Sequence, residues 1–186
     1  MSKMILVTGG ARSGKSNFAE ELCKKQNNKT AYIATSVAFD EGMKDRINKH
    51  KSHRPSEWTT YESYKNLDKV ILEIYKEHQT IILDCATLMV NNLMFDREID
   101  YDSISHNEID SLEADIKDEF TKLISEIKKT SLYVVVVTNE IGLAPVAGNR
   151  LTRIYTDIIG RINQLLAISS DEVYFVVSGI PLRIKG

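Results

Sequence analysis

The chain of 186 residues contains little cysteine, little proline and no long apolar run. Its two cysteines, Cys23 and Cys85, are far apart in the sequence, so we predict neither a disulfide framework nor a zinc site. The longest apolar run, which begins at Leu132, is far too short to span a bilayer. The apolar run near the N-terminus, residues 4–8, is also too short for the core of a signal peptide. We therefore expect a cytoplasmic protein that does not insert into a membrane.

The chain also lacks an excess of basic residues, because its formal net charge at pH 7 is -2. A dedicated nucleic-acid-binding protein usually carries a basic stripe, so we expect no nucleic-acid partner. The hydrophobic share of 42% and the charged share of 27% are ordinary for a globular protein. With no repeat, low-complexity segment or linker evident, we predict a single domain over residues 1–186.

Short apolar segments alternate along the chain with segments of helical periodicity. The predicted strands are residues 4–8, 30–35, 80–85, 132–138 and 172–179, with a short sixth strand at 180–185. The predicted helices are residues 15–26, 40–51, 65–77, 88–95, 104–129 and 149–168. This alternation predicts an α/β fold, in which helices flank both faces of a mostly parallel sheet.

One glycine-rich stretch, GGARSGKS at residues 9–16, lies between the first predicted strand and the first predicted helix. Gly9, Gly14, Lys15 and Ser16 satisfy the P-loop pattern G-x-x-x-x-G-K-[ST] in the context that this motif requires. Backbone N–H groups of such a loop surround phosphate oxygens, and the following helix directs its positive end toward the same anion. We therefore expect a P-loop NTPase fold of the RecA-like type that binds GTP or ATP.

The predicted phosphate contacts come from the whole loop: Gly9, Gly10, Ala11, Arg12, Ser13, Gly14, Lys15 and Ser16. Lys15 is expected to act catalytically by placing its charge at the β- and γ-phosphates, and the Ser16 hydroxyl to bind Mg²⁺. Arg12 has two interpretations, since its side chain either contacts phosphate or faces solvent.

An acidic residue, Asp84, follows four apolar residues of the third predicted strand. A carboxylate at the carboxyl end of that strand would lie on the same edge of the sheet as the P-loop and could bind Mg²⁺. The alternative is that Asp84 caps the following helix, and the two roles are compatible.

The segment DRINKHKSHRP, residues 45–55, contains two histidines among several basic residues. By periodicity, His50 continues the apolar stripe of Met43 and Ile47, which favours a partly buried histidine on a helix that faces the core. The alternative is that the neutral imidazole of His50 faces phosphate and attacks phosphorus.

A family resemblance bears on this choice. The stretches ILVTGGARSGKS, YIATS, DRI..HK..RP, VVTNEIG, NRL, GRINQ.LA and VVSGIP, in this order from Met4 to about Lys185, resemble the adenosylcobinamide kinase / adenosylcobinamide-phosphate guanylyltransferase family. The P-loop alone is not specific, but its combination with the other stretches is.

The resemblance implies two reactions. The enzyme would phosphorylate the aminopropanol hydroxyl of adenosylcobinamide with a nucleoside triphosphate, and would then transfer GMP from GTP to adenosylcobinamide phosphate with release of pyrophosphate. The GMP-carrying histidine of the family falls on His50. Some members have a His-His pair there, whereas this chain has Lys49 and His50.

The resemblance also implies further nucleotide contacts and an assembly. The implied contacts are Ala34, Thr35, Ser36, His53, Arg54, Pro55, Ser56, Glu62 and Asp84, where Asp84 replaces a glutamate of some members. None of His53, His78 and His106 matches a catalytic position of the family. The segment Thr138 to Glu140 either positions substrate or water or forms a turn. The family forms homotrimers, so a homotrimer is expected here.

Two other functions stay open at this point. A simple small-molecule kinase would use the same P-loop without a covalent nucleotide. A regulatory nucleotide switch would act through a partner surface, and the predicted helix 104–129 is a candidate for such a surface.

Overall fold

The computed structural model describes residues 1–37, 41 and 55–186, and its core is one seven-stranded sheet. The spatial order of the strands is β3-β2-β4-β5-β1-β6-β7. Their bounds are β1 Lys3–Gly9, β2 Thr30–Ala34, β3 Thr59–Glu62, β4 Thr80–Asp84, β5 Tyr133–Val137, β6 Glu172–Val177 and β7 Ile180–Lys185. All neighbouring strands are parallel except β7, which runs antiparallel to β6.

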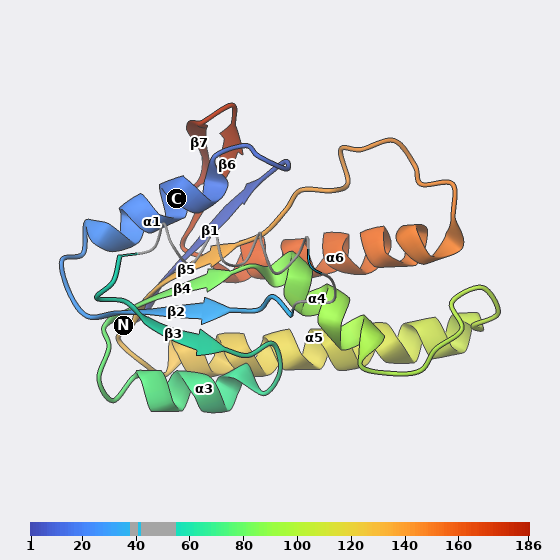
Figure 1. The fold of residues 1–186 in the computed structure, drawn as a ribbon, viewed down its shortest axis with the longest axis horizontal. Coiled ribbons are helices and arrows are strands. Elements are labelled where there is room, and N and C mark those ends of the chain that lie inside the picture. Colours follow the sequence, from blue (N-terminus) through green and yellow to red (C-terminus); the bar gives the residue numbers. More distant parts are fainter. Residues whose placement is uncertain (38–40, 42–54) are drawn as a thin grey trace.

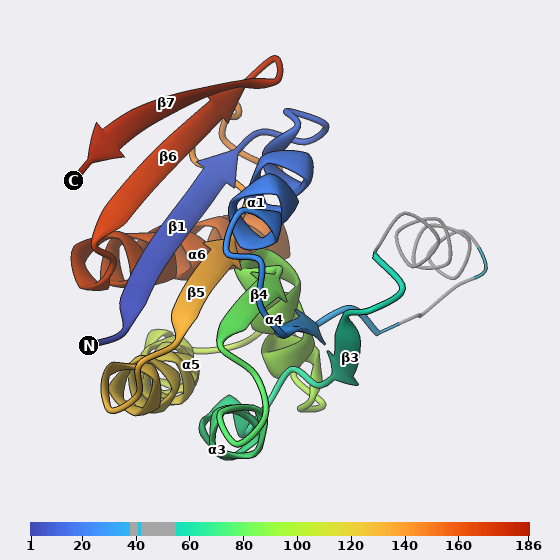
Figure 2. The same ribbon diagram turned by 90° about the vertical axis from the view of Figure 1, so that its left-hand side faces the viewer.

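The described helices lie on both sides of this sheet (Figure 1). Their bounds are α1 Lys15–Lys24, α3 Leu67–Ile74, α4 Ala86–Phe95, α5 His106–Lys128 and α6 Arg150–Ser169. Helices α3, α5 and α6 cover one face, and α1 packs on the other face against β1, β4 and β5. The predicted α/β fold with a mostly parallel sheet is therefore confirmed. The sheet is twisted, as parallel sheets of this kind are (Figure 2).

Apolar side chains form two cores, one for each face of the sheet. The larger core joins alternate residues of the strands to α3, α4, α5 and α6, and the smaller core joins the other residues to α1. Strand β5 shows how this division arises, because its sequence YVVVV is rich in β-branched residues that suit a buried strand. Val134 and Val136 belong to the larger core, whereas Val135 and Val137 belong to the smaller one.

Most of the predicted elements are confirmed, with ends that shift by a few residues. The short strand at residues 180–185 is present as β7, although all of its residues are exposed. Strand β3 was not predicted from the sequence, and its pairing with β2 makes it the edge of the sheet. The predicted helix 40–51 lies outside the described residues, apart from Glu41.

Strand β5 lies between β1 and β4 in the sheet. The strand that ends in the P-loop is therefore not adjacent to the strand that ends in Asp84. This inserted strand is a feature of the RecA-like architecture, and it determines which residues meet at the carboxyl edge.

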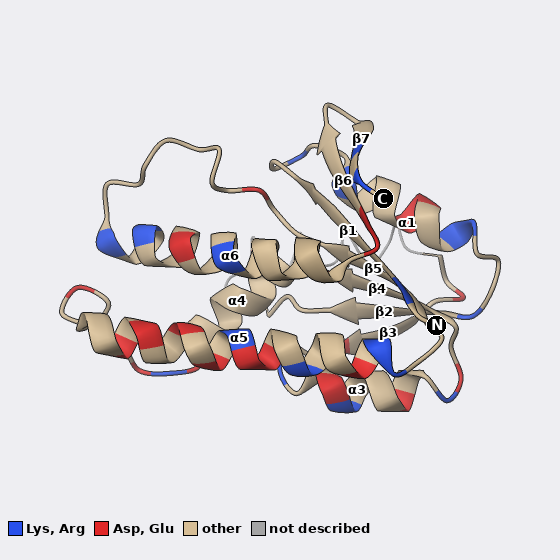
Figure 3. Ribbon diagram, turned by 180° about the vertical axis from the view of Figure 1, so that it is seen from behind, with Lys and Arg blue, Asp and Glu red and all other residues tan. Residues whose placement is uncertain are grey.

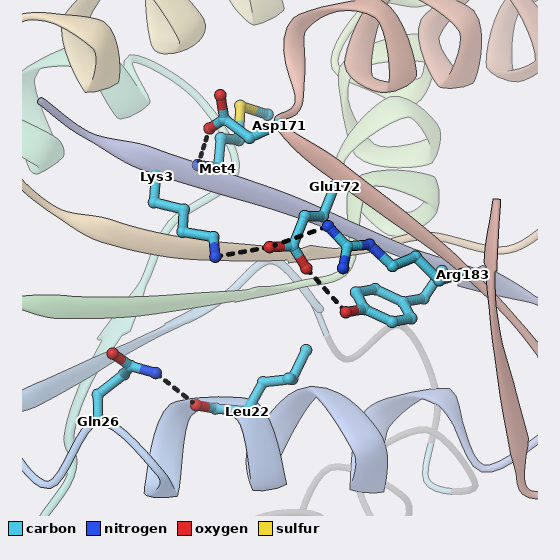
Figure 4. Close-up of polar contacts among 8 residues, drawn as sticks. Lys3, Met4, Leu22, Gln26, Asp171, Glu172 and Arg183 are labelled. Carbon is cyan, nitrogen blue, oxygen red and sulfur yellow. Dashed lines mark hydrogen bonds and ion pairs between the residues drawn. The ribbon is translucent and has the colours of Figure 1, made fainter. Parts of the chain in front are cut away.

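A polar cluster fixes the opposite edge of the sheet, where β1 and β6 begin (Figure 4). The Lys3 ammonium lies 2.5 Å from the Glu172 carboxylate, and the Arg183 guanidinium lies 3.6 Å from the same carboxylate. The Tyr174 hydroxyl donates a hydrogen bond to the other oxygen of Glu172 at 2.7 Å. Hydrogen bonds from Lys3 and Tyr174 lower the pKa of Glu172. The cluster ties β1, β6 and β7 together far from the P-loop.

Charged residues of both signs lie along α5 on the far side of the molecule (Figure 3). One of the ion pairs on this helix joins Lys122 and Asp118 at 2.6 Å, four residues apart. Six apolar residues of α5 are buried: Leu112, Ile116, Phe120, Leu123, Ile124 and Ile127. The apolar stripe of this helix therefore packs in the core, which speaks against the helix as a partner surface.

Candidate active site

The loop that joins β1 to α1 forms the centre of the candidate site. Its backbone turns at Arg12 and Gly14, which both have positive φ angles, of 57° and 90°. The amide of Ser13 donates to the carbonyl of Gly10 at 3.3 Å, which closes the turn. Arg12 itself is exposed, which agrees with the interpretation that its side chain faces solvent.

The fit of this loop requires glycine at two positions. A Cβ atom at Gly9 would lie 2.6 Å from both the Ser13 hydroxyl and the carbonyl oxygen of Val176. A Cβ atom at Gly14 would lie 3.1 Å from the Cα atom of Gly179, and the φ angle of Gly14 disfavours any side chain. The motif glycines therefore allow close packing of the loop against β6 and the turn that follows it.

Helix α1 starts inside the loop, with Gly14 as its N-cap residue. No side chain among the described residues caps this helix, and its first turn contains no acidic residue. The N–H groups at the start of α1 therefore remain available to an anion, and the helix dipole favours negative charge there.

Lys15 is the first residue of α1 and is largely buried beneath the loop. Its ammonium donates a hydrogen bond to the carbonyl oxygen of Gly10 at 3.0 Å. Burial lowers the pKa of Lys15, and the negative charge of Asp84 opposes that shift. A buried cation with a single backbone acceptor is poised to exchange that acceptor for phosphate oxygens.

Asp84 ends strand β4 and lies half-buried near the P-loop lysine. The Tyr32 hydroxyl donates to its carboxylate at 2.8 Å, which fixes the orientation of the acid. Helix α4 has Cys85 as its N-cap residue, and Asp84 precedes it. The alternative prediction, that Asp84 caps the following helix, is therefore wrong, because the N-cap residue of α4 is Cys85.

The carboxyl ends of β2, β3 and β4 bring together three of the predicted contact residues. In the strand register, Ala34 is paired with Glu62 on one side and with Asp84 on the other. Ser36 lies two residues beyond Ala34 and is half-buried. The expectation that Asp84 and the end of β2 lie at one edge of the sheet is confirmed, whereas Glu62 reaches this edge through β3, which was not predicted.

Thr35 has a structural role at this edge. Its buried hydroxyl donates to the carbonyl of Cys85 at 2.7 Å and accepts from the amide of Cys85 at 2.8 Å. The carbonyl oxygen of Thr35 accepts a hydrogen bond from the Asn92 side chain at 2.6 Å. The amide of Thr35 donates to the backbone carbonyl of Asp84 at 3.3 Å. The Thr35 hydroxyl thus holds the end of β2 against the start of α4, and the nucleotide contact expected of this residue stays a prediction.

Of the predicted contacts in residues 53–56, the structure describes Pro55 and Ser56. Pro55 and Ser56 begin a turn in which the Trp58 amide donates to the carbonyl of Pro55 at 3.1 Å. His50, His53 and Arg54 lie outside the described residues.

The two described histidines lie away from the P-loop. His78 is buried beside β3, where its ring nitrogens contact Ile74 and Thr59. His106 is the exposed first residue of α5. The expectation that neither histidine is catalytic stays a prediction.

Comparison with known proteins decides the family. Residues 5–184 match the family described as cobinamide kinase / cobinamide phosphate guanyltransferase. The chain belongs to this family. Membership makes it an enzyme of the kinase and nucleotidyltransferase type, as the resemblance implied.

The relatives of the chain include proteins of nearly the same length. The bifunctional adenosylcobalamin biosynthesis protein CobU of Escherichia coli is 43% identical over 98% of this chain and 99% of its own. CobU of Salmonella typhimurium is 44% identical with the same coverage. The bifunctional protein CobP of Pseudomonas aeruginosa is 31% identical over 97% of this chain and 96% of its own.

Two features of the site were not expected from the sequence. The turn between β6 and β7 lies against the P-loop, where the amide of Gly179 donates to the carbonyl of Ser13 at 2.8 Å. Ser178 and Gly179 both have positive φ angles, of 51° and 82°, which is typical of a tight hairpin turn. The sequence VVSG that precedes β7 is the local signal of this turn, but its contact with the P-loop is long-range.

The second feature is a polar network that fixes the segment after β5. The Thr138 hydroxyl donates to Asn163 at 2.7 Å, and Asn163 donates to the carbonyl of Asn139 at 3.0 Å. The side chain of Asn139 donates to the Thr87 hydroxyl at 3.0 Å, and the Tyr155 hydroxyl donates to the carbonyl of Thr87 at 3.1 Å. Helices α4 and α6 thereby hold Thr138 and Asn139, which favours a structural role for these two residues, although they lie in an irregular segment before the turn at Gly142.

None of the described helices is long and apolar enough to cross a membrane.

Proposed function

We propose that one nucleotide site, at the carboxyl edge of the sheet, serves both reactions of the family in this chain. The first reaction transfers the γ-phosphoryl group of GTP or ATP to the aminopropanol hydroxyl of adenosylcobinamide. The second transfers GMP from GTP to adenosylcobinamide phosphate. The observation that carries the proposal is the P-loop itself, in which an uncapped helix start, a buried lysine and the nearby Asp84 converge.

In the phosphoryl transfer, the loop acts by position and charge. The N–H groups at the start of α1 would bind the phosphate oxygens of the nucleotide. The Lys15 ammonium would leave the carbonyl of Gly10 and neutralise the charge that develops on the transferred group. Gly9 and Gly14 keep the loop in the required shape because no side chain fits there.

The donor set at this edge suits Mg²⁺. Asp84 supplies a carboxylate and Ser16 a hydroxyl, which are the hard oxygen ligands that Mg²⁺ prefers beside substrate phosphates. Among the described residues, no group of three or more His, Cys, Asp and Glu side chains could hold a metal by itself. That fits a cation bound by few protein groups together with the nucleotide. When bound, the ion would supply charge neutralisation at the phosphates.

In the guanylyl transfer, we assign the carrier role to His50, which lies outside the described residues. Its neutral imidazole would bond to the α-phosphorus of GTP and release pyrophosphate. The phosphate of the corrinoid acceptor would then take the GMP group, and the imidazole would leave. A neutral imidazole is abundant at cellular pH because the unperturbed pKa of histidine is about 6.5. Support for this assignment comes from the sequence match in this segment.

We further propose that Arg54, His53, Pro55, Ser56 and Glu62 contact the guanine nucleotide, and that the chain forms a homotrimer in the cytoplasm. The contacts and the homotrimer rest on the resemblance alone, and the cytoplasmic location rests on the composition of the sequence. Analytical ultracentrifugation would test the assembly: a single species of three times the chain mass supports the homotrimer, and a monomer contradicts it.

The experiment that tests the proposed function is mass spectrometry of the protein after incubation with GTP and Mg²⁺. We expect an acid-labile increase in mass equal to one guanylyl group, located on His50. The variant His50→Ala should lack this adduct, whereas the control His106→Ala, at an exposed helix start, should retain it. An adduct that persists in His50→Ala, or that never forms in the wild type, would contradict the guanylyl half of the proposal.

A further inference from the structure

The segment after β5 brings one acidic residue, Glu140, next to the P-loop through its backbone. Thr138 and Asn139 are committed to the network described above. Glu140 follows them, and its amide donates to the carbonyl of Gly9 at 3.1 Å. The residue is thus tied by its backbone to the first glycine of the phosphate-binding loop.

Among the described residues, one hydrogen bond orients the carboxylate of Glu140. One of its oxygens, Oε1, accepts a hydrogen bond from the amide of Gly142 at 3.1 Å. The side chain is half-buried, so it can be reached from solvent. A carboxylate that is held in place and accessible can accept both a hydrogen bond and a proton from a bound alcohol.

The topology distinguishes Glu140 from the other described acids at this edge. Strand β5 is the direct neighbour of β1, whereas β4 is separated from β1 by β5 and β3 lies at the far edge of the sheet. Asp84 receives the Tyr32 hydroxyl and lies where we place the metal ion. Glu62 is the last residue of the edge strand β3, which is farther from β1 in this order.

We propose that Glu140 is the general base of the phosphorylation step, which rests on the proposed function. The acceptor hydroxyl oxygen forms a bond to the γ-phosphorus. The bond from the γ-phosphorus to the bridging oxygen breaks, and its electron pair leaves with the nucleoside diphosphate. The hydroxyl proton passes to the Glu140 carboxylate and from there to solvent.

The guanylyl transfer does not require a general base at Glu140. The acceptor in that reaction is a phosphate, which is already an anion at cellular pH and needs no base to become a nucleophile. Loss of the Glu140 carboxylate should therefore separate the two reactions.

Two substitutions distinguish a base from a turn-forming residue. Glu140→Gln keeps a carbonyl oxygen that can accept from Gly142 but cannot take up a proton. Glu140→Ala removes both functions. If Glu140 only stabilises the turn, the glutamine variant should behave as the wild type and the alanine variant should lose thermal stability. If Glu140 is the base, both variants should lose phosphorylation.

The experiment measures transfer of the γ-phosphate of GTP to adenosylcobinamide, together with formation of the GMP adduct, for each variant. For Glu140→Gln we expect the kcat of phosphorylation to fall about a hundredfold or more, with an unchanged melting temperature and normal adduct formation. The control Glu98→Gln changes an exposed glutamate away from the loop and should retain both activities. A kcat of Glu140→Gln within about threefold of that of the control would overturn the inference, since general bases contribute far more. A wild type without phosphorylation would instead refute the proposed function.

Discussion

The structural role assigned to Thr35 leads to a quantitative prediction. Thr35→Val keeps the shape of a side chain that is 1% exposed but removes its hydroxyl. The carbonyl of Cys85 would keep the amide of Met89, which donates to it at 3.1 Å. The amide of Cys85 would lose the Thr35 oxygen and stay buried without an acceptor. An orphaned buried donor costs about 1 to 3 kcal/mol, so we expect the free energy of unfolding to fall by about 2 kcal/mol.

Equilibrium unfolding in urea would measure this loss. We expect a lower midpoint at an unchanged slope, because the area buried on folding is nearly the same in both proteins. The control is Thr60→Val, which makes the same change at an exposed position of β3. Nucleotide affinity of the folded Thr35→Val protein should stay close to that of the wild type. The reasoning is refuted if Thr35→Val is no less stable than Thr60→Val, or if it stays stable and loses nucleotide affinity.

Three further substitutions test other parts of the structure. Gly14→Ala should destabilise the protein by about 1 to 2 kcal/mol and weaken GTP binding, because φ is 90° and the new Cβ would meet Gly179; normal GTP binding by this variant would contradict the fit of the loop. Gly160→Ala should raise the free energy of unfolding by about 0.5 to 1 kcal/mol, because an added Cβ inside α6 meets nothing within 4 Å; a loss of stability would contradict this. Glu172→Gln should cost about 0.5 to 1 kcal/mol at pH 7. Hydrogen bonds from Lys3 and Tyr174 hold the pKa of Glu172 below the ordinary value of a glutamate, so its contribution is present above that ordinary pKa and disappears as the pH falls through the lowered pKa. Urea unfolding at several pH values should therefore show that the free energies of unfolding of the wild type and Glu172→Gln converge at low pH. A difference that stays constant with pH would contradict the stabilising role of the cluster around Glu172.

The parts of the fold that follow from local sequence could be predicted. The P-loop and its flanking strand and helix depend on residues 4–24 alone, where apolar periodicity and motif glycines agree. Strand β5 was equally clear, since a run of valines has no competing interpretation in so short a segment. Asp84 was placed at the correct edge because the carboxyl ends of parallel strands meet there.

The missed elements depend on contacts between distant segments. Strand β3, with the sequence TTYE, is short and largely exposed, so no hydrophobic pattern marks it. It forms because β2 offers an unpaired edge to it.

The missed site features have the same origin. The contact of Gly179 with Ser13 joins residues from opposite ends of the chain. The tie from Glu140 to Gly9 likewise depends on β5 lying next to β1. A tertiary contact of this kind leaves no periodic trace in either segment.

The central claim is that one P-loop serves both reactions, and Lys15→Ala tests it most directly. Transfer of the γ-phosphate to adenosylcobinamide and transfer of GMP to adenosylcobinamide phosphate should be measured separately, with Lys24→Ala at the other end of α1 as the control. The account predicts that both rates fall by about a hundredfold or more in Lys15→Ala, as is usual when a charged group that stabilises the transition state is removed. A variant that loses one reaction and keeps the other at the rate of the control would contradict a single shared site.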